Sequence, residues 1–145
     1  MQLTEHFSLE EMTRSDAAVR KNIDNTPPPA ELNNLKLLCH NVLEPLRLKV
    51  NEVIRITSGY RCEKLNKLIG GAKNSQHVEG KAADIRCENM STEELFIFIT
   101  NSNLPYCQCI NEFQQWIHVS YDPNNIKREK LRATKVNGKT VYTKA

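Results

Sequence analysis

The side chains best suited to metal chemistry lie in a polar stretch, residues 75–84, and in a later strand-like segment that contains His118. The polar stretch holds His77 and Asp84, with Gly80 between them. Glycine adopts positive φ readily, so Gly80 permits a sharp turn. Two imidazoles and one carboxylate are a suitable donor set for catalytic zinc, which keeps a fourth position for water. These residues predict a zinc centre only where the fold brings them together.

The spacing alone does not establish a metal site. A single histidine in a strand is more often a core or surface group than a ligand, and an aspartate after a glycine turn is usually a turn or cap residue. Because side chains alternate along a strand, Asp84 shares a face with Ala82, and the preceding turn could bring it back beside His77. By the same alternation, His118 shares a face with Trp116. The centre therefore requires these segments to be neighbours.

Three stretches of alternating or β-branched residues predict the strands that could carry these side chains. They are residues 53–57, 81–87 and 116–121. Near the C-terminus, Asn137-Gly138 between β-forming residues is a strong hairpin signal. With the helices described next, these strands predict an α+β fold in which residues 1–145 form a single domain, with helices packed on one antiparallel sheet.

Helix signals separate the predicted strands. Two capping boxes predict helix starts, one at Ser8 and one at Ser91, and the second helix is expected to run to about Thr100. A leucine-rich stretch has apolar residues at helical spacing, and Pro45 within it should kink that helix or end it early. A further helix is predicted over residues 62–69, before a Gly-Gly pair.

Composition excludes several classes of protein. The chain has 145 residues, a net charge of +3 and 39% hydrophobic residues, as expected of one globular domain. Its five cysteines include no CxxC pair, so we expect neither a disulfide framework nor a cysteine-rich zinc site. The N-terminus lacks a signal-peptide pattern, and no apolar run reaches the ~20 residues of a membrane span, so we expect synthesis in the cytoplasm. Action on a cell wall would then require release of the protein.

The C-terminal segment is basic. Residues 123–145 carry seven lysines and arginines and one acidic residue. Such a segment is typical of attraction to an anionic surface, such as a cell wall or a nucleic acid, but the simpler interpretation is a solvated, solubilising tail. Because the segment lacks interleaved aromatic residues and a nucleic-acid-binding motif, we expect no nucleic-acid partner.

Several motifs together resemble the zinc D-alanyl-D-alanine carboxypeptidase family, whose fold is shared by the hedgehog signalling domain and by phage endolysins that cut wall peptides. The resemblance rests on SGYR at residues 58–61, the SxHxxGxAxD pattern at residues 75–84 and the Trp-x-His strand at residues 116–118. It implies that His77, Asp84 and His118 are zinc ligands. It also implies a hedgehog/DD-peptidase-like fold and a peptidoglycan peptide as substrate.

Two further side chains are candidates for catalysis. Many relatives carry an acid three positions before the final histidine, where this chain has Gln115, which cannot act as a base. Glu112 lies six positions before His118, and the two would share a face of a continuous strand, so Glu112 is the predicted general base. By resemblance, Arg61 binds the substrate carboxylate or polarises the scissile carbonyl. A surface glutamate and a structural arginine are the simpler alternatives.

The remaining site candidates have open roles. Ser75 and Gln76 could hydrogen-bond the substrate or brace the loop, and Trp116 could line the cleft or pack in the core. Two functions compete. One is a zinc-dependent peptidase acting on peptidoglycan stem peptides, as a D-Ala-D-Ala carboxypeptidase or an endolysin-type enzyme. The other is a non-catalytic, zinc-containing binding module like the hedgehog domain; the missing acid favours it, whereas Glu112 and Arg61 favour the enzyme.

Overall fold

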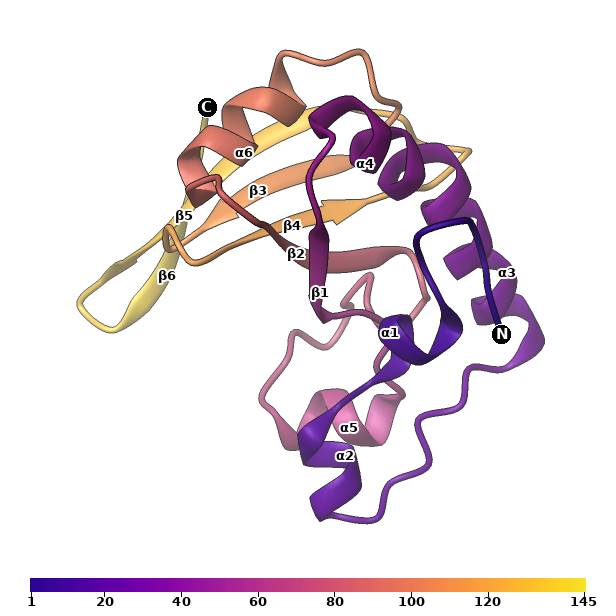
Figure 1. Ribbon diagram of the computed structural model, residues 1–145. Helices are drawn as coiled ribbons and strands as arrows, with labels where there is room; N and C mark the ends of the chain where they lie inside the picture. Colours follow the sequence, from indigo (N-terminus) through magenta and orange to yellow (C-terminus); the bar gives the residue numbers. More distant parts are fainter.

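Six strands form one sheet in the computed structural model, which describes residues 1–145 (Figure 1). The strands are β1 (Ile54–Ser58), β2 (Ala82–Cys87), β3 (Gln108–Glu112), β4 (Trp116–Ser120), β5 (Glu129–Val136) and β6 (Lys139–Lys144). Their order across the sheet is β1-β2-β4-β3-β5-β6. The α+β class and the strands β1, β2 and β4 are as predicted. β3 was not predicted, because its sequence QCINE lacks alternation of apolar and polar side chains.

The sheet is mixed, which corrects the expectation of an antiparallel sheet. β3 and β5 run parallel, with Glu112 beside Ala133, whereas the other neighbouring pairs are antiparallel. The connection from β4 to β5, residues 121–128, passes one end of β3 and places β5 on its far side. Because β4 is antiparallel to β3, a strand that returns antiparallel to β4 must run parallel to β3.

The basic C-terminal segment consists of a loop and a hairpin. The hairpin comprises only β5 and β6, so it is shorter than the basic segment 123–145. Its turn holds Asn137 at φ 51° and Gly138 at φ 78°, the left-handed conformations that favour an Asn-Gly pair in a tight hairpin. In Figure 1 the hairpin, in yellow, extends beyond the rest of the sheet.

Helices precede and separate the strands. They are α1 (Leu9–Thr13), α2 (Asp16–Arg20), α3 (Pro29–Leu38), the π-helix η1 (Cys39–Leu43), α4 (Glu44–Val50), α5 (Glu63–Leu68) and α6 (Thr92–Thr100). The capping boxes expected at Ser8 and Ser91 are both formed, whereas the short α2 was not predicted. Pro45 does not end its helix; the wider turn η1 lies directly before α4, as is common where proline disturbs the hydrogen-bond ladder. None of the helices has the length and apolar character needed to span a membrane.

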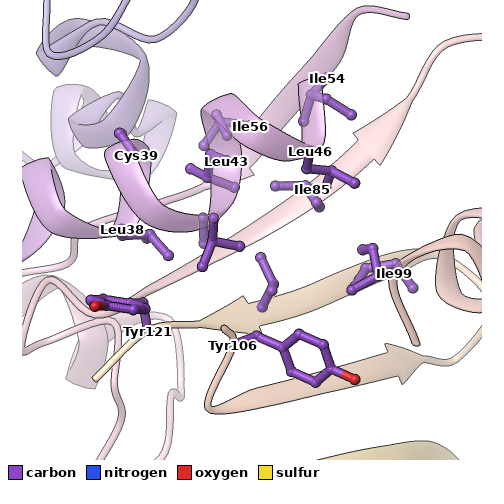
Figure 2. Close-up of a cluster of buried hydrophobic side chains, with 14 of the residues drawn as sticks. Leu38, Cys39, Leu43, Leu46, Ile54, Ile56, Ile85, Ile99, Tyr106 and Tyr121 are labelled. Carbon is purple, nitrogen blue, oxygen red and sulfur yellow. The ribbon is translucent and has the colours of Figure 1, made fainter. Parts of the chain in front are cut away.

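The hydrophobic core lies on one face of the sheet (Figure 2). In Figure 1, α4 and α6 cover that face, and α5 lies on the other side. The core joins side chains from the helices and from β1 and β2, among them Leu38, Leu43, Leu46, Ile56, Ile85 and Ile99. Alternation along β4 sends Ile117 and Val119 into this core. His118, between them, therefore points to the opposite face.

Gly59, which follows β1, packs so closely against α1 that it leaves no room for a side chain. A Cβ at Gly59 would lie 2.2 Å from the Met12 carbonyl oxygen, which accepts a hydrogen bond from the Tyr60 amide at 2.7 Å. We therefore expect Gly59→Ala to lower the free energy of unfolding by about 1–3 kcal/mol, because the backbone must move to relieve the clash. Urea denaturation followed by circular dichroism measures the change. An unchanged midpoint would contradict this tight packing.

Candidate metal centre

Three buried donor side chains meet on the face of the sheet opposite the core. The exposed fraction is 3% for His77, 8% for Asp84 and 8% for His118. Asp84 Oδ1 lies 3.2 Å from His77 Nε2 and 3.4 Å from His118 Nδ1. Asp84 and His118 are direct cross-strand partners on β2 and β4, so the register of the sheet itself brings them together.

His77 reaches the other two donors from a turn-rich loop between α5 and β2. Its backbone amide donates a hydrogen bond to Ser75 Oγ at 3.1 Å, so Ser75 braces this loop. Gly80 has φ 74°, and a Cβ there would lie 2.5 Å from the Glu31 carbonyl oxygen. Both the conformation and the close packing favour glycine at this position. The sharp turn expected at this glycine is therefore present, and it leads the chain from the histidine back into β2.

The outer nitrogen of each imidazole is held by an oxygen atom. His77 Nδ1 lies 2.8 Å from the Gly59 carbonyl oxygen, which can only accept, so Nδ1 carries a proton and Nε2 is the nitrogen that a cation would use. His118 Nε2 lies 3.2 Å from Gln76 Oε1 and donates to it, so Nδ1 is the nitrogen that a cation would use. The nitrogens left for a cation, Nε2 of His77 and Nδ1 of His118, are the ones nearest Asp84. Such hydrogen bonds to the outer nitrogen are typical of metal-binding histidines.

This donor set fits a divalent cation such as zinc. The three ligand atoms all lie within 4.8 Å of one another, and they comprise two imidazole nitrogens and one carboxylate oxygen. Burial disfavours the Asp84 carboxylate, but the adjacent His77 and His118 rings outweigh burial and hold the pKa of Asp84 well below its usual range. Asp84 is therefore ionised at neutral pH. A buried carboxylate requires a compensating partner, which a cation at this point would supply.

The three donors line a cavity of about 470 Å³. The same cavity is lined by the other predicted site residues, namely Arg61, Ser75, Gln76, Glu112 and Trp116. A larger hollow of about 830 Å³ lies along α6, but neither histidine nor cysteine lines it. The smaller cavity is thus the one whose lining can perform metal chemistry.

Glu112 reaches this cavity from the end of β3. It pairs with Trp116 across the β3–β4 hairpin, and Trp116 shares a face of β4 with His118. Glu112 and His118 therefore do share a face, as expected. The expected continuous strand is wrong, however, because the chain reverses between them through Phe113 and Gln114, both at positive φ.

Glu112 is the carboxyl group of this hairpin that can exchange protons in the cavity. Burial raises the pKa of Glu112, the negative charge of Asp84 raises it further, and the neighbouring His118 and Arg61 oppose the rise. Gln115 lies exposed in the turn and does not line the cavity. An acid at position 115 would therefore project away from the centre in this fold.

Two hydrogen-bond donors at the cavity lack partners within the protein. Arg61 Nε and Trp116 Nε1 are buried, and neither forms a hydrogen bond. Such buried donors are rare, because leaving one unsatisfied costs about 1–3 kcal/mol. Burial lowers the pKa of Arg61 and the charges of Asp84 and Glu112 oppose this, so the guanidinium remains a cation. Both side chains line the cavity, but these two nitrogen atoms are themselves covered by protein atoms.

Part of the cavity comes from residues that the sequence did not indicate. Leu131 of β5 and Tyr142 of β6 line it, although neither belongs to a motif. The carbonyl of Gly59, which orients His77, was also not anticipated. Only the strand order, which puts β5 and β6 beside β3, reveals the contribution of the hairpin.

Comparison with protein families identifies the class of protein that this fold and site define. The sequence model of the Peptidase M15 family matches residues 5–120, and the chain belongs to that family. This confirms the resemblance to the zinc D-alanyl-D-alanine carboxypeptidases, and peptidases of the family are generally zinc-dependent. The match contains the three donors and Glu112, and it ends before β5 begins. A search among curated proteins found no match.

Proposed function

We propose that this protein is a zinc-dependent peptidase that hydrolyses peptide bonds in peptidoglycan stem peptides. The observation that carries the proposal is the meeting of His77, Asp84 and His118, with one imidazole nitrogen of each histidine near the same carboxylate oxygen. The nearby carboxyl group of Glu112 and the guanidinium of Arg61 support an enzyme, because both line the same cavity. Membership of the Peptidase M15 family supports the peptide substrate.

In this proposal each cavity residue has one task. Zinc, when bound by the three donors, would polarise a carbonyl oxygen and lower the pKa of a water molecule to about 7. Glu112 accepts the proton from the attacking water and delivers it to the leaving amine. Arg61, which lines the cavity, binds a carboxylate or carbonyl oxygen of the substrate through its fork of donors. Trp116 forms part of the cleft wall.

Arg61→Lys should lower the rate of peptide hydrolysis about ten- to a hundredfold while zinc stays bound. Lysine keeps the positive charge but loses the planar fork, and losing a hydrogen bond to a charged group costs about 1.5–3 kcal/mol. Steady-state kinetics and elemental analysis test this. Arg55→Lys is the matched control, because Arg55 lies exposed on β1 and pairs with Glu88. Wild-type turnover in Arg61→Lys would show that the guanidinium is only structural.

The second candidate function is a zinc-containing binding module without turnover. The presence of Gln115, where many relatives carry an acid, favours it. The half-buried Glu112 in the cavity counts against it, because this residue offers a proton acceptor from the neighbouring strand. Turnover of a peptide by the zinc-loaded protein separates the two functions.

A pair of synthetic stem peptides tests the proposed function and the type of bond that is cut. One ends in D-Ala-D-Ala with a free carboxylate, and the other has the same sequence with a C-terminal amide. A carboxypeptidase releases D-alanine only from the first, because it must bind the terminal carboxylate. An endopeptidase cuts both at an internal bond, which mass spectrometry locates. Cleavage of neither peptide, nor of longer stem peptides, by the zinc-loaded protein would contradict the proposal.

A further inference from the structure

The β5–β6 hairpin forms part of the wall of the cavity, although it lies outside the region matched by the Peptidase M15 family. Leu131 and Tyr142 are its contributions to the cavity lining. Other parts of the wall come from the loop that precedes His77, including Gly71 and Asn74. A substrate bound at the three donors would therefore lie between residues inside the matched region and a hairpin outside it.

The register of the sheet puts Tyr142 in line with Glu112. Tyr142 pairs with Ala133, and Ala133 pairs with Glu112. On its other side, Glu112 pairs with Trp116. Residues paired side by side in this way present their side chains on the same face of a sheet. Since alanine has only a methyl group, no large side chain of this row separates the tyrosine from the glutamate.

The electrostatics agree with this placement. Partial burial raises the pKa of Tyr142, and the negative charge of Glu112 raises it further. At the same time, 55% of the surface of Tyr142 is exposed, so much of the residue is not packed against other parts of the protein. An exposed aromatic ring that lines the same cavity as the Glu112 carboxyl group is free to contact a ligand.

Contacts on both faces hold the hairpin in place. On the side of α6, Arg132 Nη2 lies 2.7 Å from Glu93 Oε2, and the guanidinium carbon lies 4.8 Å from the centroid of the Phe96 ring. On the cavity side, Lys135 Nζ lies 5.4 Å from the centroid of the Phe113 ring. Arg132 and Lys135 lie on β5 on either side of Ala133, the residue that pairs with Tyr142. The position of the tyrosine is therefore defined by the fold and is not that of a solvated tail.

We propose that Tyr142 is a substrate-binding residue, whose ring packs against the peptide beside the scissile bond. The proposal rests on the peptidase function proposed above and adds a contact that the family region does not contain. A tyrosine suits a peptide ligand because it offers an apolar face and a hydroxyl group that can hydrogen-bond to the backbone. Leu131, which lines the same cavity from β5, extends the apolar surface. The hairpin thus contributes to substrate affinity.

Steady-state kinetics of the full-length, zinc-loaded protein test this contact. Tyr142→Ala should raise KM about tenfold and leave kcat within about twofold, since a contact made equally in the ground state and the transition state acts on KM alone. Tyr142→Phe keeps the ring and should retain most of the affinity. Val141→Ala is the matched control, because Val141 precedes Tyr142 in β6 and points to the opposite face. Wild-type KM in Tyr142→Ala would overturn the proposal.

Two further measurements keep this test independent of folding and of turnover. If Tyr142→Ala lowers the melting temperature, Tyr142→Leu replaces it, because leucine fills part of the same space without the aromatic ring. If the wild type cleaves no peptide, the proposed peptidase function has failed, and calorimetric titration with a stem peptide then tests Tyr142 alone. Weaker binding by the Tyr142 variant than by Val141→Ala supports the contact. Equal binding overturns it.

Discussion

Glu112→Gln should slow peptide hydrolysis by about 10²–10⁴-fold, the usual cost of removing a general base. Glutamine keeps the size and shape of the side chain but cannot accept the proton of the attacking water. In the cavity, no carboxyl group other than Glu112 and the proposed ligand Asp84 is available for this task. Zinc content and the melting temperature should stay at their wild-type values, because Glu112 is not one of the three donors.

Glu88→Gln provides the matched control for this variant. Glu88 lies outside the cavity and pairs with the exposed Arg55, so its loss should leave kcat unchanged. Stopped assays on a stem peptide, with elemental analysis of the same samples, give the rate per bound zinc. Equal rates in Glu112→Gln and the wild type would remove Glu112 from the mechanism. The proton acceptor would then have to be another group, such as one on the substrate.

His118→Ala should abolish metal binding and hydrolysis together. The wild type is expected to carry one zinc ion per chain, because one set of three buried donors surrounds one point. Removing one of three protein ligands leaves a nitrogen and a carboxylate, which is too few for a stable catalytic site. Elemental analysis should find little zinc in the variant, and the rate should fall to background. Full zinc content in His118→Ala would contradict the assignment of the ligands.

Zinc-dependent stability provides a second readout for the same variant. A ligand present at a thousand times its Kd stabilises the folded state by about 4 kcal/mol, so zinc should raise the melting temperature of the wild type. His118→Ala should melt at the same temperature with zinc and with chelator. His40→Ala is the control, because His40 lies exposed in η1, and it should respond to zinc as the wild type does. A zinc response in His118→Ala would point to a metal site elsewhere.

The resemblance that implied the three ligands could be found from the sequence because its motifs are short local patterns. Alternation along β2 predicts that Asp84 shares a face with Ala82, and alternation along β4 predicts that His118 shares a face with Trp116. In the structure Asp84 and His118 are cross-strand partners and lie on the same face of the sheet. The glycine turn correctly brought His77 back toward β2. These features depend on a few neighbouring residues, so local rules are enough to predict them. The capping boxes that start α1 and α6 belong to the same class of signal.

The strand order could not be predicted, because it depends on contacts between distant segments. Nothing in the sequence of β3 marks it as a strand. Its neighbour β5 follows β4 in the chain, but the two are not adjacent in the sheet, because β3 lies between them. The face of Glu112 was therefore predicted correctly for a wrong reason, since a hairpin and not a continuous strand joins it to His118. Tyr142 was missed for the same cause, because only the parallel pairing of β3 with β5 brings it to the cavity.

Digestion of purified peptidoglycan tests the central claim most directly. The zinc-loaded protein is incubated with the polymer, with the polymer and a chelator, and with the polymer after zinc is restored, and mass spectrometry identifies the released fragments. We predict cleavage within stem peptides in the first and third samples and none in the second, with the His118→Ala protein inactive throughout. Release that is unaffected by the chelator, or no release in any sample, would contradict a zinc-dependent wall peptidase.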